Sequence, residues 1–265
     1  MEPLLSAINL YPVKGIRAVA VDRALVTPAG LEHDRRWMVV DDRGQFLSQR
    51  THPRLALVTG STADGRLDLA APGLPPLHLQ VPDGIRRLQV TVWDDQVDAA
   101  AADPRADRWL SRFLGRACRL AYLDDPSGRP LSSSHGKARE VVSFADGYPC
   151  LLASTASLAD LNGRLSDPLP MDRFRPNLVV EGCGAFAEDG WRRLAIGEAV
   201  FRFAGLCARC TVTTVDQQTG LSGCDEPLRT LAGYRRQEKG VMFGVNLVPE
   251  RTGQVALGDR VTVLE

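Results

Sequence analysis

The sequence predicts a fold of the α+β class in which strands dominate. Three observations support this expectation. Short apolar stretches separated by turn residues fill the first hundred residues, one clear amphipathic helix follows them, and the second half returns mainly to strand patterns. The chain has 265 residues, of which 44% are hydrophobic and 24% charged, and this composition is that of a globular protein with a substantial core.

The first hundred residues predict an antiparallel β-rich unit, for which a β-barrel or a sandwich is the simplest packing. Trp37 to Asp41 leads into a turn at Asp42-Arg43-Gly44, and Phe46 to Arg50 is the expected hairpin partner. The other strands expected in this part are 4–13, 55–59, 67–70, 77–81 and 88–93.

One helix and one long loop mark the middle of the chain. Asp103 supplies an N-cap, Pro104 takes the first helical position, and Gly115 ends the helix. The polar stretch 124–139 is rich in Ser, Pro and Gly and predicts a loop, so we divide the chain there into domains 1–123 and 124–265.

The second half predicts a mixture of strands and short helices. Helices are expected at 154–165 and 226–236, and strands at 178–181, 211–215, 242–248 and 260–264. Residues 194–203 predict a hairpin around Gly197-Glu198, which leads directly to a pair of cysteines.

Charge and targeting signals limit the class of partner. Thirty-two basic and 32 acidic residues give a formal net charge of zero, so no global field attracts nucleic acid or an anionic membrane. No run of eighteen apolar residues and no secretory signal pattern occur. We therefore expect a cytoplasmic protein with neither a nucleic-acid partner nor a membrane partner. Six cysteines are too few for a disulfide scaffold in a chain of this length.

The sharpest local motif is Cys207-Ala208-Arg209-Cys210. Two thiols at this spacing suit a soft metal or a redox pair, whereas free cysteines are also commonly buried and inert. Cys183 and Cys224 could complete a four-cysteine zinc site. The segment after the motif is a poor helix start, which disfavours a thioredoxin-like pair. Arg209 favours the thiolate form of its neighbours and hence metal ligation.

A second group of candidates is cationic. Lys14 lies beside Gly15, Arg35 precedes a strand, and Arg175 lies close to Asn177. Lysine next to glycine allows backbone N–H groups to approach a phosphate, and arginine adds a bidentate grip. Any one of these residues could instead be a solvated surface charge. The Asp146-Gly147-Tyr148 turn is a further candidate for ligand contact, although Asp-Gly is also ordinary turn chemistry.

Taken together, these blocks resemble a known family. The matching segments are Tyr11 to Gly15, Asp34 to Asp41, Phe174 to Val180 and Cys207 to Asp216. They are similar to the MOSC family, in particular to its amidoxime-reducing and hydroxylaminopurine-detoxifying branch, which carries an N-terminal β-barrel domain. The resemblance implies that barrel at 1–123 and a MOSC-type β-barrel with short helices at 124–265.

The resemblance also implies a molybdenum cofactor (molybdenum-molybdopterin) held between the two domains, with Cys210 as the protein ligand of the metal. Cys210 and Asp146 would be the catalytic residues. The residues implied in cofactor binding are Lys14, Gly15, Arg35, Gly147, Tyr148, Arg175, Asn177, Arg209 and Cys210. Relatives often have small hydroxyl residues at the positions of Gly15 and Gly147-Tyr148, so backbone groups would have to supply those hydrogen bonds here.

The implied reaction removes oxygen from N-hydroxylated compounds, such as hydroxylamines, amidoximes and N-hydroxylated bases, with two electrons and two protons. The sequence lacks the C-x₄-C-x₂-C run of a plant-type iron–sulfur site, so we expect a separate electron-donor protein of the ferredoxin, flavin-reductase or cytochrome type. Three alternatives stay open at this point: a non-catalytic cofactor carrier, a sulfur-transfer module that uses Cys207, and the four-cysteine zinc protein.

Overall fold

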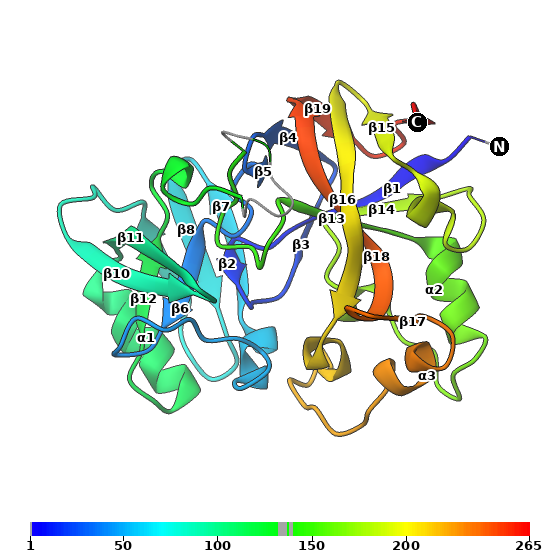
Figure 1. Ribbon diagram of the computed structural model, residues 1–265. Coiled ribbons are helices and arrows are strands. Elements are labelled where there is room, and N and C mark those ends of the chain that lie inside the picture. Colours follow the sequence, from blue (N-terminus) through cyan, green and yellow to red (C-terminus); the bar gives the residue numbers. More distant parts are fainter. Residues whose placement is uncertain (1, 132–136, 138–139) are drawn as a thin grey trace.

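The computed structural model describes residues 2–131, 137 and 140–265. A nine-stranded sheet forms the right-hand half of the molecule in Figure 1. In spatial order its strands are β20 (Val261–Val263), β15 (Arg193–Ile196), β16 (Ala199–Arg209), β18 (Gly240–Arg251), β13 (Cys150–Ser154), β14 (Leu178–Glu181), β1 (Leu4–Leu10) and β3 (Val19–Val21), and β17 (Arg236–Gln237) pairs with β18.

The helices of this half are short. They are α2 (Thr155–Asn162) and α3 (Leu228–Ala232), and the 3₁₀ turns are η3 (Met171–Arg173), η4 (Ala187–Gly190) and η5 (Thr211–Thr214). Ser154 caps α2 by accepting a hydrogen bond from the backbone N–H of Ser157. A stacked pair, Phe174 and Phe243, packs with Leu161 and Leu231 between these helices and the sheet.

A five-stranded sheet and one helix form the other half. The sheet order is β10 (Arg87–Val92), β11 (Asp95–Ala101), β12 (Arg119–Tyr122), β6 (Trp37–Val40) and β2 (Val13–Lys14). Helix α1 (Pro104–Leu114) lies against this sheet and buries Trp109, Leu110 and Phe113. All four residues of β6 are buried, so this strand forms the centre of the half.

Two three-stranded sheets complete the fold. One is β19 (Gly253–Ala256), β4 (Arg23–Thr27) and β5 (Gly30–Leu31), and the other is β7 (Thr59–Ala63), β8 (Arg66–Ala70) and β9 (Leu77–Gln80). The sheets do not follow the division at residue 123, because β1 pairs with β14 and β4 pairs with β19. Leu5 and Ile8 therefore pack in the same core as Leu178 and Val180. The division into domains 1–123 and 124–265 stays a prediction.

The predicted α+β class with dominant strands is confirmed. The pairings among the described strands give open sheets, without the closure of a barrel in either half. The predicted helix at Pro104 is confirmed with both its caps: the Asp103 carboxylate accepts from the backbone N–H of Arg105, and Gly115 adopts the left-handed conformation. No helix in the described ranges is long and apolar enough to cross a membrane.

Three predicted strands were wrong. Residues 55–59 begin within the 3₁₀ turn η1 (Pro53–Leu57), because Pro53 fixes the backbone at its start. Residues 211–215 form η5, in which the hydroxyls of Thr213 and Thr214 donate to the carbonyls of Cys210 and Thr211. Residues 46–50 make only a single bridge, between Phe46 and Val40.

Part of the predicted loop falls outside the described ranges. Its first residues contain η2 (Pro126–Gly128), whereas residues 132–136 and 138–139 are not described.

Candidate active site

A cavity of about 780 Å³ lies between residues of the first half and residues of the second. All ten residues that the sequence singled out for the site line it: Lys14, Gly15, Arg35, Asp146, Gly147, Tyr148, Arg175, Asn177, Arg209 and Cys210. They come from β2, from the loops that precede β6, β13 and β14, and from the end of β16. Segments up to about two hundred residues apart thus meet at one site.

Cys210 lies where the long antiparallel pairing of β16 with β18 ends. β16 pairs with β18 as far as Arg209, and Cys210 then starts the η5 turn. Its Sγ accepts a hydrogen bond from Nη1 of Arg50 at 3.4 Å. A rigid strand therefore presents the thiol to the cavity at the point where the chain leaves the sheet.

Arg209 lies beside the other thiol. Its Nη1 donates to Sγ of Cys207 at 2.9 Å, and its Nη2 donates to the carbonyl of Phe174 at 2.7 Å. The sequence predicted that Arg209 would flank the Cys210 thiol, but alternation along β16 directs its side chain toward Cys207 instead. Arg50, which the sequence analysis assigned only to a strand, takes the position next to Cys210.

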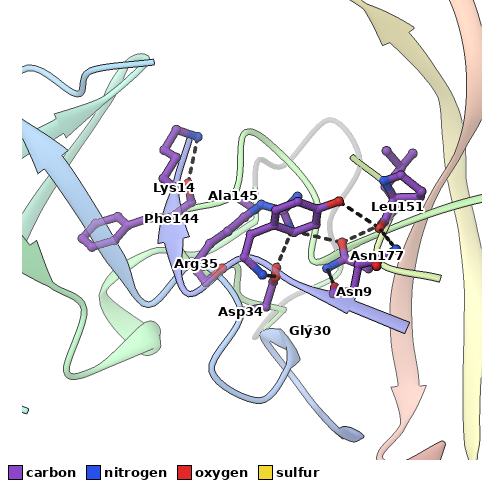
Figure 2. A network of polar contacts seen from close by, with 12 residues as sticks. Asn9, Lys14, Gly30, Asp34, Arg35, Phe144, Ala145, Leu151 and Asn177 are labelled. Atoms are coloured by element: carbon purple, nitrogen blue, oxygen red, sulfur yellow. Dashed lines mark hydrogen bonds and ion pairs between the residues drawn. The ribbon is translucent and has the colours of Figure 1, made fainter. Parts of the chain in front are cut away.

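Lys14 is a buried cation in the first half. β2 pairs in parallel with β6, and this pairing fixes the Lys14 backbone beside Met38. Its Nζ donates to the carbonyl of Phe144 at 2.8 Å, a contact visible in Figure 2, and forms an ion pair with Asp146. Burial lowers the pKa of Lys14 to about 8, although the Asp146 carboxylate opposes the decrease.

Asp146 is one of the two carboxylates that line the cavity. Burial favours its neutral form, but the ion pair with Lys14, the nearby Arg50 and a hydrogen bond from Trp93 together hold its pKa well below the ordinary value. The Trp93 Nε1–H donates to Oδ1 of Asp146 at 3.2 Å. Asp146 is therefore an ionised acceptor and not a proton donor at neutral pH. Gly147 and Tyr148 follow it along the cavity wall, and burial raises the pKa of Tyr148.

Two guanidinium groups lie over one tyrosine ring. Arg35 and Arg175 lie 4.4 and 4.2 Å from the ring centroid of Tyr11. Both arginines have left-handed backbones, with φ of 49° and 55°. Such conformations are uncommon outside glycine, and they direct both side chains into the same cavity.

Arg35 is embedded in a polar network. Its Nη1 donates to Oδ1 of Asn177 at 3.0 Å and pairs with Asp34, as Figure 2 shows. Asn177 in turn donates through Nδ2 to the carbonyl of Asn9 at 3.2 Å. Burial opposes the charge of Arg35, but Asp34, Tyr11 and Asp146 together outweigh it and raise the pKa of Arg35. The network thus links the start of the chain to the loop before β14.

Arg175 lacks such a counterion. Within the described ranges it forms no ion pair, and its Nη1 contacts only Oε1 of Gln217, at 3.4 Å. It is 9% exposed, and burial lowers its pKa to about 10. A buried cation without a carboxylate is costly, so this part of the cavity is prepared for an anion.

Two buried amides escaped the sequence analysis: Gln49, which lines the cavity, and its partner Gln217, which does not. They form a reciprocal amide pair at 3.0 and 2.8 Å, and Gln49 also donates to the carbonyl of Gly15 at 2.7 Å. The pair thus supports the Lys14-Gly15 turn. Neutral amides within a predicted strand and a loop gave no sign of this role.

The four-cysteine zinc site was wrong. In the described part of the chain no group of three or more histidine, cysteine, aspartate or glutamate side chains could hold a metal ion. Cys183 and Cys224 are absent from the lining of the cavity that contains Cys207 and Cys210.

Two segments of the chain match known domain families. Residues 2–117 match the MOSC N-terminal beta barrel domain, and residues 139–262 match the MOSC domain. The chain belongs to the family of MOSC proteins that carry this N-terminal domain.

Its relatives include amidoxime-reducing components. Mitochondrial amidoxime-reducing component 1 of Mus musculus is 35% identical, and the match covers 96% of this chain and 80% of the relative. Mitochondrial amidoxime reducing component 2 of Rattus norvegicus is also 35% identical, over 97% of this chain and 82% of the relative. The molybdenum cofactor sulfurase of Oryza sativa is 32% identical over 92% of this chain, which corresponds to 32% of that longer protein.

Proposed function

We propose that this protein is a molybdenum-cofactor-dependent reductase that removes oxygen from N-hydroxylated compounds. The names of its relatives support the reaction class and the cofactor. One observation carries the proposal for this chain: the Cys210 sulfur and three buried or half-buried cations, Lys14, Arg35 and Arg175, line the same cavity.

The residues present fit such a cofactor. Six cationic side chains line the cavity against two anionic ones, although the whole chain is neutral. Arg175 has no carboxylate partner in the described chain, which suits a phosphate group that would supply the missing charge. Lys14, Arg35 and Arg175 would hold the phosphorylated pterin, Gly15 and Asn177 would border it, and Cys210 would ligate the metal through its sulfur.

When bound, the cofactor supplies two-electron redox chemistry and an acceptor for the oxygen atom. The balanced reaction is the conversion of R–NHOH, two electrons and two protons into R–NH₂ and water. Asp146 is ionised, so its role is to accept hydrogen bonds from the N–H and O–H groups of the substrate and to orient them. The turn of Gly147 and Tyr148 forms the neighbouring wall.

The two electrons come, in this proposal, from a separate redox protein of the ferredoxin, flavin-reductase or cytochrome type. A cytoplasmic location, like the absence of nucleic-acid and membrane partners, stays a prediction.

Replacement of Cys210 tests the proposal. Wild type, Cys210→Ser and Cys224→Ser are purified from a host that synthesises the cofactor, and molybdenum and pterin are measured. We expect molybdenum in wild type and in Cys224→Ser, because Cys224 is exposed and outside the cavity, and its loss in Cys210→Ser. Turnover of an amidoxime with a chemical reductant should follow the same order. Folded wild type without molybdenum would contradict the proposal.

One observation favours a second candidate, sulfur transfer. Cys207 lines the cavity and accepts a hydrogen bond from Arg209, so a second thiol is available beside the cofactor site. The variant Cys207→Ser distinguishes the two functions. Unchanged reductase turnover supports the reductase with Cys207 as a bystander, whereas retained cofactor with complete loss of turnover supports a chemical role for this thiol.

A further inference from the structure

Arg50 makes a contact that the proposed function leaves without a role. Its guanidinium donates through Nη1 to Sγ of Cys210 at 3.4 Å, and among the described residues no other cationic group hydrogen-bonds to this sulfur. The same guanidinium lies 4.4 Å from the ring centroid of Trp93 and 5.8 Å from that of Phe46. Two aromatic rings of the first half therefore hold a cation against a sulfur of the second half.

Trp93 occupies an unfavourable position for a tryptophan. It lies in the turn between β10 and β11 with φ of 58°, a left-handed conformation that glycine or asparagine adopts at low cost but a bulky residue rarely does. The residue is also 48% exposed, so burial does not explain its presence. Its ring centroid lies 5.2 Å from that of Phe46, and its contacts with Arg50 and Asp146 both lead to the cavity.

We propose that Arg50, held by Trp93, is the positioning residue of the Cys210 sulfur. The guanidinium lies over the indole and at the same time directs an N–H at Sγ, a combination that a lysine ammonium does not reproduce. Arg50 fixes the direction of the sulfur and provides a positive charge beside it. Trp93 fixes Arg50 and, through its Nε1–H, also contacts the Asp146 carboxylate.

A consequence for the loaded protein rests on the proposed function. A hydrogen bond to a metal-bound sulfur withdraws electron density from it and raises the reduction potential of the metal. Loss of the Arg50 contact should therefore lower that potential, whereas loss of a merely structural arginine would not move it.

The first experiment uses the protein without cofactor. Cys210 is alkylated with iodoacetate, an anion, or with neutral iodoacetamide, and the ratio of the two rates isolates the local charge because the ionisation of the thiol affects both reagents equally. Trypsin cleaves after Arg209 and so separates Cys210 from Cys207, and fragment-ion mass spectrometry distinguishes Cys210 from Cys224 within the peptide 210–229. We expect Arg50→Gln to lower the ratio by about threefold or more, since one charge a few ångströms away is removed. Arg50→Lys should retain most of it.

Two variants serve as controls. Trp93→Gly suits the left-handed backbone, so it should fold as well as wild type and still lower the ratio, because Arg50 loses its support. Arg54→Gln removes an exposed guanidinium that stacks on Phe113 outside the cavity and should leave the ratio unchanged. An unchanged ratio in Arg50→Gln, or an equal decrease in Arg54→Gln, would overturn the proposal.

The second experiment uses the molybdenum-loaded protein and its potential, measured by electron paramagnetic resonance during redox titration. We expect a lower potential in Arg50→Gln and a partial return in Arg50→Lys. Equal potentials in wild type and Arg50→Gln overturn the positioning role at the metal. Absence of molybdenum from wild type refutes the proposed function instead, and the alkylation ratio then still decides whether Arg50 acts on Cys210.

Discussion

At the scale of single residues, Arg175 shows how the site and the stability of the fold oppose each other. Its guanidinium is buried over the Tyr11 ring, its backbone is left-handed, and its pKa is lowered to about 10 because burial outweighs the attraction of nearby groups. The left-handed backbone and the buried charge without an ion pair both cost stability in the free protein. They are retained, in our interpretation, because an anionic ligand recovers the cost.

Arg175→Met should therefore stabilise the cofactor-free protein while it abolishes cofactor retention. Removal of the unpaired buried charge is expected to increase the free energy of unfolding by about 1 to 3 kcal/mol, measured by urea denaturation. Arg173→Met is the matched control, because Arg173 is equally buried but pairs with Asp216. This control should lose stability. A large destabilisation by Arg175→Met would show that the charge already has a compensating partner.

Lys14 makes anion binding depend on pH in the physiological range. Its pKa of about 8 lies below the ordinary 10.5, so the ammonium is charged below about pH 8 and neutral above it. Sulfate, a dianion across this range, should raise the melting temperature more at about one pH unit below that pKa than at one unit above it. In Lys14→Gln the sulfate effect should be small and independent of pH. A wild-type sulfate effect that grows with pH would refute this assignment.

At the scale of elements, the sequence predicted best where the signal is local. The cap at Asp103, the proline at Pro104 and the glycine at Gly115 define α1 from one continuous segment of sequence, and the helix has these bounds. Likewise the hairpin around Gly197 was correct, because both strands and their turn are contiguous. The prediction that the hairpin leads to Cys207 and Cys210 also rested on contiguous sequence.

The elements that were missed or misassigned depend on distant partners or on turn chemistry. β-branched Thr211 to Val215 suggested a strand, but no sheet edge accepts it and the threonine hydroxyls satisfy the turn carbonyls instead. Short strands such as β3 and β5, which the sequence did not predict, form only through pairing with β1 and β4. Arg50 contacts Cys210 across 160 residues of sequence. No local pattern reveals such a contact, so the sequence assigned Arg50 only to a strand.

At the scale of the whole molecule, the site depends on the way the chain alternates between halves. β1, β3 and β4 lie with the second half, whereas β2 and β6 lie in the first (Figure 1). The chain therefore passes from one half to the other more than once. The family resemblance predicted a site between two domains, and the ten residues do line one cavity. Their order in the sequence gives no distances, however, and the roles we assign them remain those of the proposal.

Gly30 tests this dependence, because it belongs to an early strand, β5, that packs with the second half, and it does not line the cavity. Its φ is 108°, and a Cβ at this position would lie 2.6 Å from the carbonyl oxygen of Pro149, which follows the Asp146-Gly147-Tyr148 turn. Gly30→Ala should therefore move that turn. We expect a loss of about 2 kcal/mol or more in the free energy of unfolding, together with weaker cofactor retention.

Gly65→Ala is the control that separates backbone strain from displacement of the Asp146-Gly147-Tyr148 turn. Gly65 has a positive φ of 71° but nothing within 4 Å of a built Cβ, so the substitution adds only backbone strain. We expect a decrease of about 1 kcal/mol in unfolding free energy and full molybdenum content. If Gly30→Ala retains as much molybdenum per folded chain as Gly65→Ala, the packing of Gly30 against Pro149 does not shape the site. If it loses the metal while remaining folded, the close packing of Gly30 on Pro149 is what holds Asp146 in place.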